Sequence, residues 1–174
     1  MFTLRGLMLR LNGSSKGPLR RVFGGSAVMC TNSSDTAFNY NLTTSTVVQF
    51  SAIKTPANTD DITVDLANNR FIANRPGRYL AFFTLPQFSQ SFRATLEGII
   101  YVNGTIASSR SFSYIRAAVE SNNRSVVDGS SILQLNQGDL VTVQVIRTED
   151  VDNNTNGPIN MLENATFGIL KVDD

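Results

Sequence analysis

The chain has 174 residues, a length that suits one domain with or without a terminal extension, and its formal net charge of +1 gives it no polyelectrolyte character of the kind that nucleic-acid binding favours. It contains no histidine and a single cysteine, so a Ser-His-Asp or Cys-His catalytic system, an intrachain disulfide and a multi-cysteine zinc site are all excluded. We therefore expect a protein that is not an enzyme and that uses no cofactor.

The first 25 residues differ in composition from the rest of the chain. The basic residues Arg5, Arg10, Lys16, Arg20 and Arg21 all precede Asp35, the first acidic residue. Glycine and serine interrupt the same segment, most densely between residues 13 and 18. This shift predicts a basic arm over residues 1–25 and a folded domain over residues 26–174.

Apolar residues in the arm are spaced for docking on a partner. Leu4, Leu7, Met8 and Leu11 recur at i, i+3, i+4 and i+7, which permits a short amphipathic helix, while the alternation ending at Leu11 equally permits a strand. A helix this short is not stable alone in water. We expect the arm to dock through the charges of Arg5, Arg10, Arg20 and Arg21 and through the apolar anchors Leu4, Leu7, Met8 and Leu11.

From about residue 43 onward the pattern is that of short strands separated by turn residues. The candidate strands are Thr46–Ile53, Ile62–Leu66, Arg70–Ala73, Arg78–Pro86, Ala94–Val102, Ala107–Ile115, Ser125–Ser130, Ser131–Asn136, Leu140–Arg147 and Thr166–Val172. Asn103-Gly104 between two alternating runs is the strongest hairpin signal. Roughly ten short strands at this spacing predict an all-β sandwich or jelly roll.

The last third of the chain shows the clearest alternation. Apolar residues recur at every second position in Ser131–Asn136, Leu140–Arg147 and Thr166–Val172, which predicts strands with one buried face. The polar break from Asn136 to Asp139 contains a glycine and suits a tight hairpin turn. Cys30 is expected to be a small buried apolar residue.

An ordered set of short motifs resembles the C1q-like and TNF-like jelly-roll family from about residue 45 to residue 173. The set consists of Phe71 to Ala73, Pro76-Gly77-Arg78-Tyr79, Phe82 and Phe83, Asn103-Gly104, Ser131-x-Leu133-x-Leu135, Gly138-Asp139, Val141-x-Val143-x-Val145 and Thr166-Phe167-Gly168. The sequence departs from the family pattern where Gly168 directly follows Phe167, and it contains no collagen-like repeat.

This resemblance implies a jelly-roll sandwich that forms a tight homotrimer. The segment Arg78–Pro86 is apolar at nearly every position, so one of its faces can fill the sandwich while the other packs on a neighbouring subunit. A strand buried on both faces within one subunit is the alternative. Tyr79, Phe83 and Phe167 are the candidates for core or trimer contacts.

Two acidic stretches carry no site prediction. Asp152–Glu163 has the spacing of a twelve-residue calcium loop, but strands rather than helices are expected on both sides of it. The carboxylates of Glu149, Asp150 and Asp152 are expected to lie together on a solvated loop. No metal site is predicted.

Two functions are compatible with these features. The first is a structural protein, a trimeric jelly roll that decorates or cements a larger assembly such as a viral capsid, attached by its N-terminal arm and located on the virion surface. The alternative is a C1q-like recognition or adhesion module that binds a protein or glycan through its loops. The first eleven residues lack the apolar core of an export signal, and no membrane or nucleic-acid partner is expected.

Overall fold

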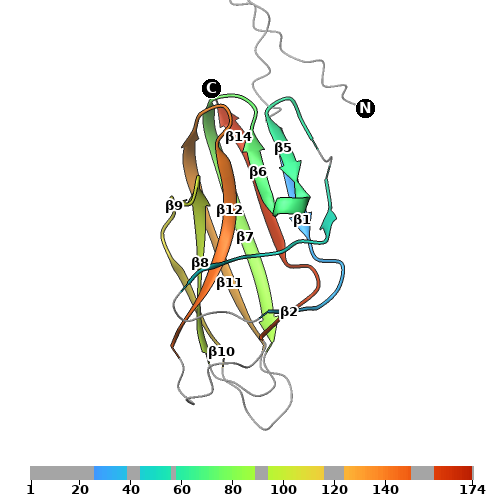
Figure 1. Ribbon diagram of the computed structural model, residues 1–174, viewed down its shortest axis with the longest axis vertical. Coiled ribbons are helices and arrows are strands. Elements are labelled where there is room, and N and C mark those ends of the chain that lie inside the picture. Colours follow the sequence, from blue (N-terminus) through green and yellow to red (C-terminus); the bar gives the residue numbers. More distant parts are fainter. Residues whose placement is uncertain are drawn as a thin grey trace, which may run out of the picture.

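The computed structural model shows a sandwich of two antiparallel sheets, as Figure 1 shows. The structure describes residues 26–38, 44–55, 58–88, 94–115, 124–149 and 159–173. Over these ranges no helix has the length and hydropathy needed to cross a bilayer. The all-β jelly-roll class predicted from the sequence is confirmed.

Sheet A is organised around β7, which pairs with β11 along one edge and with β14 and then β13 along the other. The order continues from β14 through β1 to β4, and from β13 to β2. Its strands are β1 (Ala27–Thr31), β2 (Thr36–Phe38), β4 (Ala52–Ile53), β7 (Gly77–Phe88), β11 (Arg124–Leu135), β13 (Ile159–Met161) and β14 (Thr166–Asp173).

Sheet B has the order β10-β8-β12-β6-β5, with β9 on β8 and β3 on β12. Its strands are β3 (Thr46–Val47), β5 (Ile62–Asp65), β6 (Arg70–Ala73), β8 (Ala94–Val102), β9 (Thr105–Ile106), β10 (Ser111–Ile115) and β12 (Leu140–Glu149). A 3-10 helix, Leu66–Asn68, joins β5 to β6. Edge strands β10 and β11 close one side of the sandwich, where the hydroxyls of Ser113 and Ser125 hydrogen-bond.

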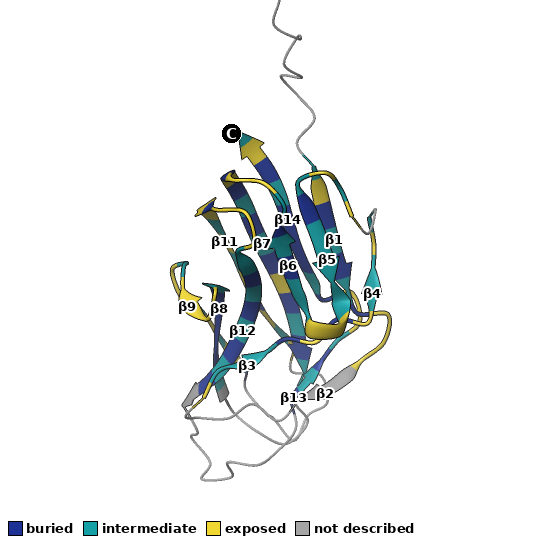
Figure 2. Ribbon diagram, turned by 45° about the horizontal axis from the view of Figure 1, so that its top comes forward, coloured by how far each residue is buried: buried dark blue, intermediate teal, exposed yellow. Residues whose placement is uncertain are grey.

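The core lies between the sheets and is filled by alternate residues of their strands, which Figure 2 shows as alternating buried and less buried bands. The ring of Phe167 lies 4.6 Å from that of Phe71 and 6.0 Å from that of Phe50, measured between centroids. On β12 the inward residues Val141, Val143 and Val145 are fully buried. Complete burial of an aliphatic or aromatic side chain stabilises a fold by about 1.5–3 kcal/mol. The predicted period-two strands with one buried face are confirmed.

Two glycines make room for an aromatic ring in this core. A Cβ on Gly98 would lie 2.7 Å from Phe83 Cε2, and one on Gly129 would lie 2.9 Å from Phe83 Cζ. Real Cβ atoms do not approach other atoms so closely, so both positions need the absence of a side chain. The Phe83 ring therefore bridges the two sheets near the β10–β11 side.

The single strand predicted over Thr46–Ile53 is wrong. Residues at its start, in β3, belong to sheet B, whereas those at its end, in β4, belong to sheet A. Between them Val48 N donates to Val143 O at 3.0 Å and Ser51 N donates to Thr31 O at 3.2 Å. The chain crosses between the sheets here because both Val48 and Phe50 are then buried against the core.

Other strand boundaries also differ from the prediction. The predicted break between Ser130 and Ser131 is absent, because β11 pairs continuously with β7 over its whole length. The predicted strand Ala107–Ile115 is shortened to β10, after the small strand β9. Strands β1, β2 and β13 were not predicted, since each is short and has little alternation to detect.

The two predicted turns have different outcomes. Asn103-Gly104 forms the predicted hairpin, with φ of 51° and 78° and Val102 paired with Thr105. The Asn136–Asp139 turn is not a hairpin, because it joins β11 of sheet A to β12 of sheet B. A polar turn signals a chain reversal, but it does not determine whether the returning strand pairs with its predecessor or crosses to the opposite sheet.

Candidate functional site

In the described part of the chain, the outer face of sheet A carries apolar side chains that are partly or largely exposed. On β7, Tyr79, Ala81, Phe83 and Leu85 are 0–2% exposed and point into the sandwich. The alternate residues therefore point outward. The strand register places the apolar residues among these outward positions in rows with outward apolar residues of the neighbouring strands.

Two rows make up this face. In the first, Leu80 of β7 lies between Ile132 of β11 and Leu170 of β14, and Leu170 is followed by Ala27 of β1. In the second, Phe82 lies next to Gly168, which is followed by Met29. Val172, at the register shift near the end of β14, is exposed beside the first row. We call the set Ala27, Met29, Leu80, Phe82, Ile132, Leu170 and Val172 the assembly surface.

The ring of Phe82 lies across Gly168, since a Cβ at that glycine would collide with the ring. Gly168 is the residue whose position departs from the family pattern in the sequence. Its lack of a side chain lets a large ring lie flat over two neighbouring strands. The Phe82 ring therefore occupies the space above Gly168 at the centre of the assembly surface.

Exposure is highest at the margins of the assembly surface and on the neighbouring edge. Ile132 and Val172 are 67% and 52% exposed. On edge strand β10, Phe112 and Tyr114 are 61% and 50% exposed and point away from the core, since Ile115 next to them is buried. Surface apolar residues scattered singly are ordinary, but contiguous rows of them are typical of interaction sites.

A buried carboxylate lies on β8, the strand next to β10. The side chain of Glu97 is 2% exposed, and its Oε1 lies 2.8 Å from Nη1 of Arg110, which itself is half in solvent. Glu97 is the cross-strand partner of Phe112. The ion pair gives the buried charge a partner and fixes the start of β10 at the edge.

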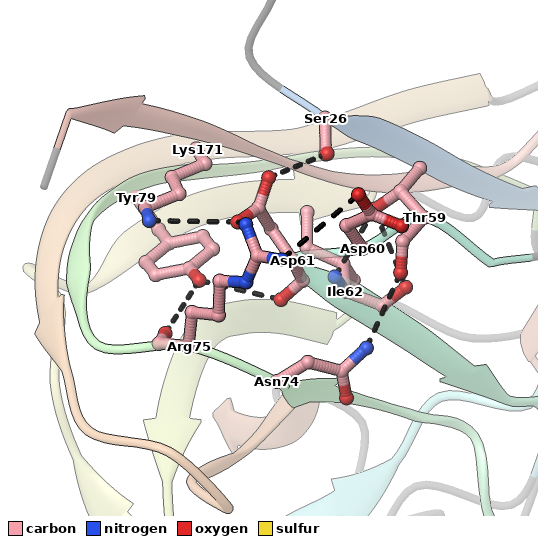
Figure 3. A network of polar contacts seen from close by, with 9 residues as sticks. All are labelled: Ser26, Thr59, Asp60, Asp61, Ile62, Asn74, Arg75, Tyr79 and Lys171. Carbon is pink, nitrogen blue, oxygen red and sulfur yellow. Dashed lines mark hydrogen bonds and ion pairs between the residues drawn. The ribbon is translucent and has the colours of Figure 1, made fainter. Parts of the chain in front are cut away.

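At the end of sheet A where the described chain begins, polar side chains converge on Asp61 (Figure 3). Asp61 Oδ2 accepts a hydrogen bond from Ser26 Oγ at 2.6 Å, and its Oδ1 lies 3.5 Å from Lys171 Nζ. The Tyr79 hydroxyl donates to Arg75 O at 2.7 Å. Burial is the main reason that the pKa of Tyr79 is raised, so this hydroxyl stays a donor at neutral pH.

The opposite end of β1 borders a groove of about 730 Å³. It is lined by Ser33, Ser34, Asp35, Pro86, Arg124, Leu162, Glu163 and Asn164. Asp35 Oδ1 accepts a hydrogen bond from the backbone N–H of Glu163 at 2.8 Å, so one of the two carboxylates is already engaged. Within the described ranges, no group of three or more His, Cys, Asp or Glu residues could hold a metal ion.

The residues singled out from the sequence are distributed as follows. Tyr79, Phe83 and Phe167 lie in the sandwich core, 0%, 2% and 1% exposed. Cys30 is buried as expected, and burial raises the pKa of its thiol to about 11. The arm residues Leu4, Arg5, Leu7, Met8, Arg10, Leu11, Arg20 and Arg21 lie outside the described residues, as do Asp150 and Asp152.

Sequence reasoning did not single out the assembly surface itself. Its central residues Leu80 and Phe82 alternate with Tyr79 and Phe83 in one continuous apolar run. The run indicated that both faces of the strand are apolar. It did not indicate which set of alternate residues points outward.

Comparison with known proteins gives a result at the level of fold. No protein-family model matches the chain, and no curated protein matches its sequence. The globular domain of zebrafish complement 1qA superimposes with a TM-score of 0.58 at 18% identity, covering 86% of this chain and 98% of that one.

Two TNF-type structures give similar values. Murine APRIL has a TM-score of 0.58 at 14% identity and covers 85% of this chain and 99% of its own. Eiger TNF from S. frugiperda has a TM-score of 0.54 at 12% identity, with 86% and 94% covered. At such low identity the likeness establishes the C1q/TNF-like jelly roll as the fold of this chain and nothing finer.

Proposed function

We propose that the protein is a homotrimeric jelly-roll head that decorates or cements a larger assembly, such as a viral capsid, to which its basic N-terminal arm attaches. The observation that carries the proposal is the assembly surface, a set of apolar side chains that the described part of one protomer leaves partly or largely exposed. The C1q/TNF-like fold supports a trimer, because the family resemblance seen in the sequence implies that arrangement.

Two different apolar regions of one protomer suit a head-to-tail contact. The assembly surface spans β1, β14, β7 and β11, while Phe112 and Tyr114 lie on edge strand β10. When unlike patches of identical subunits meet, a suitable rotation closes them into a ring. A stable interface buries about 800 Å² on each partner and is anchored by aromatic residues near its centre. Packing the aromatic edge of one subunit on the assembly surface of the next would supply such anchors.

Attachment through the arm is supported by charge and by position. Residues 1–25 carry only basic ionisable side chains. The start of β1 pairs with the C-terminal part of β14, since Ala27 is the partner of Leu170, and β14 leads to the end marked C in Figure 1. The head can therefore project from a shell while its arm grips it. A location on the virion surface follows from the same proposal.

The alternative function is recognition of a protein or glycan ligand. It is favoured by the groove lined by Asp35, Arg124 and Glu163, which lies at the end of β1 opposite Ser26. Charged and hydroxyl side chains around a Pro86 and Leu162 floor offer both hydrogen bonds and apolar contact. A head attached by its arm would present this groove away from the shell.

The proposal is tested by light scattering of the full chain beside the 26–174 truncation, followed by co-sedimentation of both with the purified particle. We expect both proteins to have three times the mass of the protomer, and only the full chain to sediment with the particle. Loss of folding in the truncation, or binding that survives without the arm, would contradict the division into arm and head.

A further inference from the structure

The groove at the end of β1 opposite Ser26 opens on the outer side of sheet A. Pro86, one of its lining residues, points outward from β7, since Leu85 and Gln87 on either side of it are fully buried. Pro86 is four positions beyond Phe82 along the strand, which corresponds to about 13 Å. The groove therefore lies on the same face as the assembly surface but at a distance from it.

A polar row separates the groove from the assembly surface. Thr84, between Phe82 and Pro86 on the outward side of β7, is the register partner of Asp128 on β11 and of Thr166 on β14. Thr84 and Asp128 are exposed. A subunit contact that is confined to the assembly surface would leave the groove accessible to solvent.

The groove is held in shape by the turn between β13 and β14. Three consecutive backbone N–H groups of this turn donate to three different segments of the chain. The acceptors are Pro86 O for Leu162 at 2.9 Å, Asp35 Oδ1 for Glu163 at 2.8 Å and Asn32 O for Asn164 at 2.9 Å. Because the turn is already fixed, a ligand bound here loses little affinity to the ordering of the protein.

The groove offers polar groups of both signs. Within the described part of the chain, neither the guanidinium of Arg124 nor the carboxylate of Glu163 forms a hydrogen bond or an ion pair, and both side chains are exposed. Asp35 uses Oδ1 for the turn and keeps Oδ2 for another donor. The hydroxyls of Ser33 and Ser34 can donate as well as accept.

We propose that this groove binds a neutral saccharide. Neighbouring sugar hydroxyls can donate to Glu163 and accept from Arg124, while the C–H face of the ring packs on Pro86 and Leu162. A cationic ligand would be repelled by Arg124, and an anionic ligand by Glu163 and its neighbouring carboxylate. The groove volume of about 730 Å³ is within the usual range of small-molecule sites.

The inference deepens the alternative function and rests on it, because it names the class of ligand that the head would recognise. It does not depend on what the N-terminal arm binds. Its test is therefore separate from co-sedimentation with a particle.

The experiment titrates the full chain with two kinds of probe and follows its backbone amide chemical shifts by NMR. The first kind is neutral saccharides, namely lactose and the methyl glycosides of mannose, galactose, glucose and N-acetylglucosamine. The second kind is charged peptides, namely trilysine and triglutamate. The amides of Glu163 and Asn164 report on the groove.

Glu163→Ala and Arg124→Ala each remove one charged group from the groove. Asp60→Ala and Arg75→Ala are matched controls, because they remove the same charges from side chains that are 86% and 59% exposed near Asp61, at the other end of the sandwich (Figure 3). All four side chains are exposed, so the fold should be unchanged, which thermal melting checks.

We expect at least one saccharide to shift the groove amides with a Kd on the order of 1 mM, and both groove variants to bind it about tenfold more weakly than the controls. Absence of shifts with every saccharide, or equal binding by groove and control variants, would overturn the proposal. Shifts with the charged peptides alone would also overturn it and would leave recognition of a protein ligand in place. Light scattering on the same samples reports the trimer separately.

Discussion

The inner and outer faces of sheet A both carry large apolar side chains, but the surroundings of these side chains differ. On the inner face Phe83 and Phe167 are about as buried as side chains can be, whereas on the outer face Leu80 and Phe82 are partly exposed and Ile132 is 67% exposed. The inner residues have their partners within the protomer. The outer residues are less covered by the described part of the chain, so under the proposed function the inner face stabilises the fold and the outer face contacts other subunits.

The largest expected effect comes from paired changes at adjacent residues of β7. Phe83→Ala removes a ring enclosed by both sheets and should lower the free energy of unfolding by about 3–5 kcal/mol at every protein concentration. Phe82→Ala should instead lower the free energy of unfolding by an amount that depends on protein concentration, since it weakens the contact between subunits. Urea unfolding over a wide concentration range distinguishes the two, and a concentration-independent loss for Phe82→Ala would remove the distinction between the faces.

Glycine pairs provide a second and smaller contrast. A methyl group on Gly98 would lie 2.7 Å from Phe83 Cε2 and 2.7 Å from Val127 Cγ1, both enclosed, so Gly98→Ala should cost about 1–3 kcal/mol of stability. On the outer face, Phe82 can swing away from a methyl at Gly168. Gly168→Ala should therefore leave the protomer folded and weaken assembly about tenfold, equivalent to about 1.4 kcal/mol. Thermal melting and sedimentation equilibrium measure these effects, and a large drop in protomer stability for Gly168→Ala would show that its face is part of the core.

The smallest effect is expected at the rim of the outer face, where Arg78 hydrogen-bonds to Asp173. This hydrogen bond is the main reason that the pKa of Asp173 is lowered. Because the folded pKa is the lower one, the stabilisation is complete above the ordinary range of an Asp carboxyl and is lost as the pH falls through the folded value. The melting temperature of Asp173→Asn should be slightly below that of the parent at neutral pH and equal to it in acid. A difference that persists or grows in acid would point to another origin.

The sequence contained much of the fold because the alternation is local. The spacing of Val141, Val143 and Val145 predicts a strand with one buried face, whichever sheet the strand belongs to. Asn103 and Gly104 both adopt positive φ, which these two residue types tolerate, so the hairpin turn is also predicted locally. Pairing between distant strands has no such local signal. For this reason the sequence predicts a hairpin after β11, where the structure has a crossing between sheets, and it predicts one strand where the chain crosses from β3 to β4.

The candidate sites were harder to predict for a related reason. When both sets of alternate residues are apolar, as from Tyr79 to Phe83, only the position of the strand in the sheet decides which set is covered. The polar cluster at the start of the described chain consists of Ser26, Asp61 and Lys171. Asp61 is 35 residues from Ser26 and 110 residues from Lys171 in the sequence. Nothing within one window of sequence brings them together.

The most direct test of the assembly surface is the solution mass of the 26–174 protein with Ile132→Glu, measured beside the parent and Thr105→Glu. Ile132 is already exposed in the protomer, so a charge there should leave the fold intact, and Thr105→Glu adds the same charge on exposed strand β9. We expect a trimer for the parent and for Thr105→Glu, and a folded monomer for Ile132→Glu. A parent that is monomeric, or an Ile132→Glu variant that keeps the trimer mass, would contradict the assignment of this face to assembly.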